Sequence, residues 1–465
     1  MKRYSVRLAL LWFCMIIAGT SFAQYDFYLK YGSEAFGAKD YHKAVEYFTQ
    51  AVDVRPQEPA PYVNRASAYA SLQKFTEALE DLNTALTLKP DLAEAYYYRG
   101  LVYMDLKMYP QALADLDKVS QLVPTFASTY YYMALIFAEL NDAQKEVDAY
   151  TKAIETDSSF TEAWYNRGLV LARYELFQEA IQDFTRTLEL TPDFAMAWVN
   201  RAVIYSYLGD QHAALSDLNQ AVSVSPGLYL AYYNRASVYN DLGLPDSAIA
   251  DYGRAEKTES KDPRIYFNRG NLFLKKHNTD AALKDFTKAI ETDSSFVSAY
   301  INRSIIYRQQ KAFDLALADI DNAIRLSPDN PSPLVYKGFI YHAMKKKDLA
   351  MEQFNAAISM DSSYQASRIG KGYLLIEMKN YTGAEAEFLK VTASDTSSWN
   401  ALLGLALARS KTNAGESKKA LQKAVTLENC LTDGWACVQG KRLEGYFWSD
   451  AVMKEMKKLF SASSL

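Results

Sequence analysis

The sequence predicts an all-α solenoid of about eleven to twelve helix–turn–helix repeats, each 34 residues long. Three observations lead to this prediction. The decapeptide TKAIETDSSF begins at Thr151 and again at Thr287, which is 136 residues or four periods later. Counting in steps of 34 from Tyr25 gives eleven rows that end at Ser398 without an insertion or deletion. Within each half-row, the apolar residues follow the spacing of an amphipathic helix.

Small residues recur at two positions of the row. Position 8 is Gly, Ala or Ser in every row, and position 20 is Ala in all rows but the fourth, which has Glu146. Side chains of this size let two helix backbones approach closely. Positions 11 and 24 are large and apolar, as in Tyr69 with Leu82. The pattern predicts that the two helices of each row pack against one another through these positions.

The ends of the rows carry signals that stop a helix. Six rows have Pro at position 32, which ends the second helix: Pro56, Pro90, Pro124, Pro192, Pro226 and Pro328. In other rows Asp-Ser-Ser replaces the proline, as at Asp157 and Asp361. We expect these polar side chains to cap the helix that follows.

Taken together, the positions resemble the tetratricopeptide repeat (TPR) over residues 25–398. The shared features are an aromatic residue at position 4, a small residue at 8, Tyr at 11, Ala at 20 and 27, and Pro at 32. The resemblance implies two helices per repeat, stacked into a right-handed superhelix in which neighbouring repeats complete one another's core. It also implies that positions 2, 5, 6, 9, 12 and 13 of the first helix line a concave binding surface.

The first 23 residues have the features of a signal peptide. Lys2, Arg3 and Arg7 precede an apolar run, and Ser21-Phe22-Ala23 has small residues where signal peptidase requires them. We expect cleavage after Ala23 and an exported protein, periplasmic or secreted; an uncleaved N-terminal anchor is the alternative. No later stretch is long and apolar enough to span a membrane, so we expect no transmembrane span in the mature chain.

Residues 399–465 fit the period less well. We interpret them as a degenerate repeat and C-terminal capping helices, the last of which begins at Ser449 and is amphipathic. The alternative is a helix that docks onto a membrane or a partner. Cys430 and Cys437 are too few for a disulfide framework, which leaves one local disulfide or two buried thiols.

Seven rows carry Arg at position 7, and the same seven carry Asp at position 23. Rows that lack one also lack the other. A planar guanidinium can bind a carboxylate through two hydrogen bonds, so we expect structural ion pairs inside each repeat rather than a ligand site. The pairs are Arg65–Asp81, Arg99–Asp115, Arg167–Asp183, Arg201–Asp217, Arg235–Asp251, Arg269–Asp285 and Arg303–Asp319.

Asparagine recurs at position 6 of the implied concave surface, in five consecutive rows and once earlier. A side-chain amide both donates and accepts hydrogen bonds, so it can bind the main chain of a peptide whatever its sequence. Aromatic residues at position 5 add contact area. We expect the asparagines to face solvent and to form the binding site; the alternative is that they only solvate this surface. The predicted site residues are Asn64, Asn166, Asn200, Asn234, Asn268, Asn302, Tyr165, Tyr233 and Phe267.

The sequence shows no motif for catalysis, a metal or a cofactor. The four histidines, His42, His212, His277 and His342, lack the spacing of ligands. A net charge of −4 provides no basic surface for nucleic acid. We therefore predict a non-catalytic scaffold that binds a protein or an extended peptide in an envelope or secreted complex. The alternative is a substrate-delivery or assembly subunit that docks through its C-terminal helices to a membrane-associated enzyme complex. The sequence does not indicate an oligomeric state.

Overall fold

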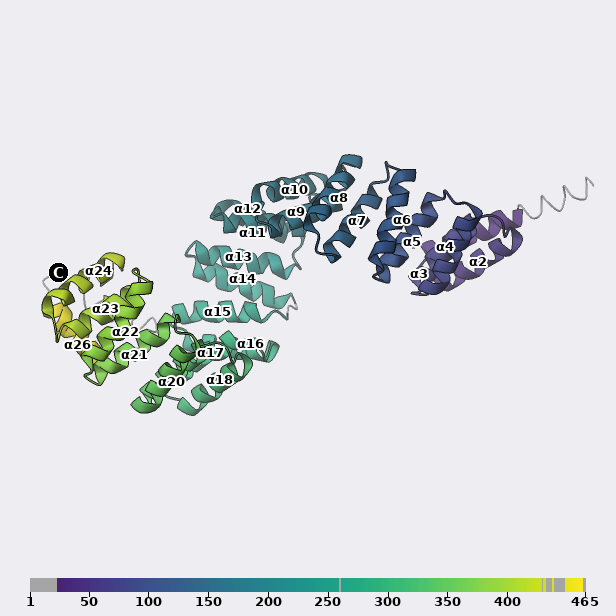
Figure 1. Cartoon of the computed structure of the whole chain (residues 1–465). Coiled ribbons are helices and arrows are strands. Elements are labelled where there is room, and N and C mark those ends of the chain that lie inside the picture. Colours follow the sequence, from purple (N-terminus) through teal and green to yellow (C-terminus); the bar gives the residue numbers. More distant parts are fainter. Residues whose placement is uncertain (1–22, 259–260, 429, 432–436, 439–447, 463–465) are drawn as a thin grey trace, which may run out of the picture. The chain divides into compact units, whose positions relative to one another are not determined.

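The computed structural model describes residues 23–258, 261–428, 430–431, 437–438 and 448–462. Every regular element in these ranges is helical, as the all-α prediction requires (Figure 1). Contacts divide the chain into two units, Met1–Val238 and Tyr239–Leu465. The predicted signal peptide lies outside the described residues, except for Ala23.

The first unit is a series of helix pairs, one pair for each 34-residue row. Residues 23–37 form the first helix. The helices that follow are α2 (Tyr41–Val54), α3 (Ala60–Ser71), α4 (Phe75–Leu88), α5 (Ala93–Asp105), α6 (Tyr109–Leu122), α7 (Ala127–Glu139), α8 (Ala143–Thr156), α9 (Thr161–Arg173), α10 (Phe177–Leu190), α11 (Ala195–Tyr207) and α12 (Gln211–Val224). Helix α13 (Tyr229–Asp241) contains the division between the units.

The second unit continues the series and confirms the predicted solenoid of helix pairs. Its helices are α14 (Pro245–Lys257), α15 (Pro263–Lys275), α16 (Thr279–Thr292), α17 (Val297–Gln309), α18 (Phe313–Leu326), α19 (Ser332–Ala343), α20 (Lys347–Met360), α21 (Gln365–Glu377), α22 (Tyr381–Ser394), α23 (Trp399–Arg409), α24 (Ala414–Leu427) and α26 (Asp450–Ala462). Helices α23 and α24 form a twelfth pair.

In the first eleven repeats, the turn between the two helices places the fifteenth residue in the left-handed region. Gly209 and Gly243 occupy this position in two repeats. Nine other repeats have a residue with a Cβ atom there, such as Lys345 at φ 63°. The left-handed conformation costs a non-glycine residue about 1–2 kcal/mol. The next residue often caps the second helix; the Asp210 carboxylate, for example, accepts the N–H of Ala213 at 3.0 Å.

The connection between repeats corrects the expectation for the Asp-Ser-Ser segments. Asp157 ends α8, and its carboxylate accepts the backbone N–H and the hydroxyl of Ser159 at 2.9 and 2.6 Å. Helix α9 then begins without a side-chain cap. The segment therefore forms a local turn, because the side chain of Asp reaches the backbone two residues later before the helix starts.

In five repeats the aromatic residue at position 4 ties the first helix to the turn that precedes it. The Trp164 indole N–H donates to the carbonyl of Ser158 at 3.0 Å, and the Tyr62 hydroxyl donates to the carbonyl of Pro56 at 3.1 Å. Tyr96, Tyr130 and Trp198 make the same contact with a carbonyl six residues earlier.

Side-chain sizes in the core are matched between the two helices of a repeat. The alanines at position 20 are fully buried, from Ala44 to Ala384. At position 8, glycine is present wherever position 24 is phenylalanine, because the ring lies against the glycine. A Cβ atom on Gly270, for instance, would lie 2.8 Å from the ring of Phe286. The other such pairs are Gly32–Phe48, Gly168–Phe184, Gly338–Phe354 and Gly372–Phe388.

Candidate functional site

The asparagines at position 6 are half-buried, which corrects the expectation that they face solvent, and Asn166, Asn200 and Asn302 bond to the preceding repeat. In the first unit, the Asn166 amide donates to the Tyr131 hydroxyl at 3.0 Å. The Asn200 amide donates to the Tyr165 hydroxyl at the same distance. The hydroxyl belongs to the position-5 residue of the repeat before. The asparagine therefore fixes neighbouring first helices to one another.

The remaining asparagines are also half-buried. Asn234 donates to the carbonyl of Leu230 at 2.8 Å. In the second unit, Asn302 donates to the side-chain oxygen of Asn271 at 2.7 Å. Asn64 and Asn268 have intermediate exposure as well. A side-chain amide has two N–H groups and an oxygen that accepts two hydrogen bonds. Each contact named here uses one N–H, which leaves the carbonyl oxygen and the second N–H outside that contact.

The aromatic residues at position 5 belong largely to the core. The Tyr165 ring packs against Phe184 and Phe194, with centroids 5.8 and 4.6 Å away. Burial raises the pKa of Tyr165, although the Asn200 hydrogen bond opposes this rise. Phe267 packs against its neighbouring phenylalanines in the same way, and Tyr233 is half-buried. These rings are only partly accessible to a ligand.

The Arg and Asp residues form bidentate ion pairs within repeats. In Arg65–Asp81 both N···O distances are 2.8 Å, and the same geometry is found in Arg269–Asp285. The hydrogen bond that Arg65 donates to Asp81 is the main reason why the pKa of Arg65 is raised. Arg99–Asp115, Arg167–Asp183, Arg201–Asp217 and Arg303–Asp319 repeat this arrangement. The side chains are largely buried between helices and contribute to packing.

Each arginine also reaches the preceding repeat, a contact that the sequence analysis missed. The third nitrogen of Arg201 donates to the Thr185 hydroxyl at 2.8 Å, and the guanidinium lies 4.9 Å from the ring centre of Trp198. Equivalent polar contacts link Arg65 to Thr49 and Arg303 to Thr287. The recurrent Thr or Asn at position 25 was the signal in the sequence. The arginines thus join each repeat to its neighbour.

Repeat seven has a further partner for its aspartate. Asp251 is fully buried and accepts a hydrogen bond from Arg254, three residues later in α14. Arg235 donates to the side-chain oxygen of Asn219 at 2.9 Å, which is the same link to the preceding repeat as elsewhere.

Repeat four lacks both the ion pair and the small residue at position 20. Glu146 replaces the alanine and is 3% exposed. The guanidinium of Arg173 lies 3.7 Å from one carboxylate oxygen. The other oxygen has no hydrogen-bond partner among the described residues. Burial raises the pKa of Glu146, and Arg173 opposes the rise. An ionised carboxylate in this place weakens the repeat.

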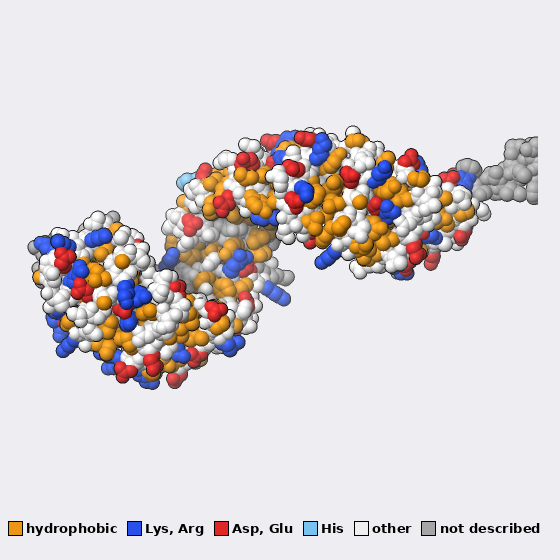
Figure 2. All heavy atoms as spheres, in the orientation of Figure 1, with side chains coloured by type: hydrophobic (Ala, Val, Ile, Leu, Met, Phe, Trp, Pro, Cys, Tyr) orange, Lys and Arg blue, Asp and Glu red, His pale blue; other side chains and the backbone are white. Residues whose placement is uncertain are grey.

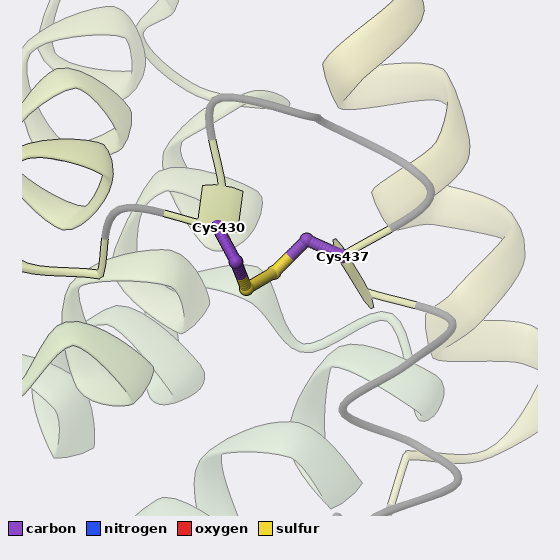
Figure 3. The surroundings of a disulfide bond; sticks show 2 residues. All are labelled: Cys430 and Cys437. Atoms are coloured by element: carbon purple, nitrogen blue, oxygen red, sulfur yellow. A yellow bond between two sulfur atoms is a disulfide. The ribbon is translucent and has the colours of Figure 1, made fainter.

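The C-terminal helix α26 packs into the apolar core of the last repeats. Val452, Met453 and Met456 are at most 5% exposed and belong to one cluster with residues of α21, α22 and α23. A disulfide joins Cys430 to Cys437 beside this cluster, with Cα atoms 5.4 Å apart (Figure 3). Of the two outcomes that the sequence allowed for these cysteines, the structure has the disulfide.

The surface offers no concentrated charge on the side that Figure 2 shows, where acidic and basic side chains are interspersed. Among the described residues, no cluster of three or more His, Cys, Asp and Glu side chains could hold a metal ion. No described helix has the length and hydropathy needed to span a membrane.

Comparison with known families identifies the repeat. Models described as tetratricopeptide repeat match residues 25–58, 93–126, 133–195, 195–227, 229–262, 263–296, 297–330 and 336–364. A model described as TPR repeat matches residues 66–107. The chain belongs to the tetratricopeptide-repeat family. The TPR matches extend over both units and cover more than half of the sequence.

Individual TPR proteins resemble the chain over different lengths. Heat shock protein STI1 of Saccharomyces cerevisiae is 45% identical over 53 residues, which are 11% of this chain and only 9% of STI1. Among solved structures, yeast Tom70 is 21% identical, with a TM-score of 0.44, over 95% of this chain and 99% of that chain. YrrB, described as a TPR protein with an unusual peptide-binding site, is 29% identical, with a TM-score of 0.35, over 40% and 97%.

Proposed function

We propose that this TPR protein is a non-catalytic scaffold that binds extended polypeptide of another protein through first helices that carry an asparagine at position 6. One observation supports the proposal above others: consecutive repeats present an amide at the same position, and the N–H contacts of Asn166, Asn200 and Asn302 leave the amide oxygen for a ligand. Amides spaced one per repeat suit an extended main chain.

The half-burial of these amides favours such a role. A side chain that is already held by Tyr131 or Tyr165 loses little conformational freedom when a ligand binds. The amides are uncharged, so we expect affinity to depend only weakly on salt concentration. Neutral hydrogen bonds contribute about 0.5–1.5 kcal/mol each, so binding relies on several repeats together.

The test needs a control for the structural role of the asparagines. After partner identification by affinity purification of the tagged full chain from its native host, one variant combines Asn166→Ala with Asn200→Ala. The matched control combines Tyr131→Phe with Tyr165→Phe, which removes the same two intramolecular hydrogen bonds. We expect the asparagine variant to bind about tenfold more weakly, as two lost contacts imply, and the control to keep its affinity. Equal losses in both variants would disprove an amide site.

We also propose that the protein is exported. The predicted signal peptide and the Cys430–Cys437 disulfide both support an oxidising compartment. N-terminal sequencing of the protein from its native host should begin at Gln24. Retention of Met1 on protein from the cytosol would contradict export.

A further inference from the structure

Helix α26 covers the first helices of the last repeats, on the side that lines the implied binding surface. It contacts α21 and α23, the first helices of repeats eleven and twelve. The ring of Trp448, just before α26, lies 6.1 Å from Tyr373 and 6.4 Å from Trp399. Lys411, two residues after the end of α23, forms an ion pair with Glu455 at 2.8 Å.

The side chains at position 9 of the first helices are more buried in the repeats that α26 contacts than in the others. In repeats two to ten the side chain at this position is half-buried or exposed, and Val203 is 45% exposed. In repeats eleven and twelve the equivalent Tyr373 and Leu407 are 6% and 1% exposed. Helix α23 has eight consecutive buried residues, 401–408, so every side of it is covered. A helix that is covered all round is apolar all round.

The chemistry of α26 is that of a helical ligand. Val452, Met453 and Met456 point into the apolar cluster, and Leu459 continues the same face. Lys454 on the opposite side is exposed, as are two further lysines. Methionine is flexible and fits apolar surfaces of different shape, and an amphipathic helix in an apolar groove is a common mode of recognition.

We propose that the first-helix surface of repeats eleven and twelve is a second binding site, for an amphipathic helix of a partner, and that α26 occupies it in the free protein. This inference rests on the proposed function as a protein-binding scaffold. The partner helix has apolar residues at the spacing of Val452, Met453, Met456 and Leu459. Because α26 belongs to the same chain, it competes as an intramolecular ligand, and a separate helix must overcome this advantage.

A disulfide anchors the segment before α26. The disulfide holds Cys437 to Cys430, while Leu431 and Val438 are fully buried in the apolar cluster.

The test uses the full chain and a fluorescein-labelled peptide with the sequence of residues 448–462. Met456→Asp places a charge in the buried face and releases α26, whereas Lys454→Asp places it on the exposed side as a control. We expect the Met456→Asp protein to bind the peptide at least about tenfold more tightly than the wild type or the control. A peptide that carries the same Met456→Asp change should not bind.

Equal affinity of the peptide for all three proteins would overturn the proposal. Hydrogen exchange of the wild-type protein provides a second measurement if Met456→Asp disturbs the neighbouring repeats. Helix α26 should open at a lower free energy than α21–α24. If α26 exchanges together with these helices, it is a fixed part of the fold and the proposal is wrong. The peptide comes from this chain, so failure here leaves partner binding at the asparagines untouched.

Discussion

Replacing Gly270 by Ala tests whether the core depends on matched side-chain sizes. Gly270 lies in the middle of α15, and its added Cβ atom would approach the Phe286 ring to 2.8 Å. Gly100 occupies the same position in α5, but faces Leu116, whose nearest atom would be 3.2 Å away. The leucine side chain can change rotamer to make room for the added Cβ atom, whereas the fully buried phenylalanine ring has little room to move.

The expected magnitudes follow from two opposing effects. Replacing glycine by alanine inside a helix stabilises it by about 0.8–1.0 kcal/mol. Overpacking a core costs about 1–3 kcal/mol. We therefore expect Gly100→Ala to be neutral or stabilising by up to about 1 kcal/mol. Gly270→Ala should be destabilising by up to about 2 kcal/mol. The difference between the two variants reflects the ring alone, because the helix contribution cancels.

The assay must report on single repeats, because an array of repeats does not unfold in one step. Hydrogen exchange measured by mass spectrometry gives opening free energies for α15–α16 and α5–α6 separately. Adding Phe286→Leu to Gly270→Ala should restore stability, since Ala66 with Leu82 is a pair that the protein already uses. If Gly270→Ala is no more destabilising than Gly100→Ala, side-chain matching is not what selects glycine here.

Three further predictions concern charge and backbone. The side chains of Arg201 and Asp217 are 13% and 6% exposed, so replacing either one by alanine should lower the stability by about 3–5 kcal/mol. A double-mutant cycle should give a coupling energy of more than about 0.5 kcal/mol, and additive losses of stability would refute the pairing. Glu146→Gln should stabilise repeat four by about 1–3 kcal/mol at pH 7, measured by hydrogen exchange. Because the pKa of Glu146 is raised in the folded state, its ionisation destabilises the repeat above the folded-state pKa, and this penalty disappears below the unfolded-state pKa. The stability gained by Glu146→Gln should therefore vanish near pH 4. A gain in stability that persists at that pH would contradict this reasoning. Lys345→Gly should raise the stability of repeat ten by up to about 1 kcal/mol, whereas Gly209→Ala should lower that of repeat six; the same sign for both would refute a backbone origin.

The repeat and its helix pairs were predictable because the signals are local. Small residues at positions 8 and 20 and proline at 32 act within one row, and the period makes them visible. The match of Gly270 with Phe286 was also present in the sequence, but it appears only when positions 8 and 24 are compared in pairs. The second contact of Arg201 is sixteen residues before it, the same separation as the ion pair with Asp217 after it.

The packing of the proposed binding surface was not predictable from the period. Whether Asn166 faces solvent depends on how closely the preceding repeat approaches, and that distance is set by the stacking of helices. Helix α26 follows Trp448, which contacts Tyr373 although the two residues are far apart in the sequence and Trp448 belongs to no repeat. A one-row pattern contains no information on such contacts.

The contacts that join neighbouring repeats restrict the number of residues between them. The Trp164 indole reaches back six residues, and the Arg201 guanidinium reaches back sixteen. One extra residue in a connecting turn displaces the chain by about 3.8 Å, which is more than any of these hydrogen bonds can stretch. Gain or loss of a complete 34-residue unit instead presents every donor with an equivalent acceptor. Copying whole units is therefore the change in length that this architecture tolerates, and the decapeptide shared by Thr151–Phe160 and Thr287–Phe296 is what such copying leaves behind.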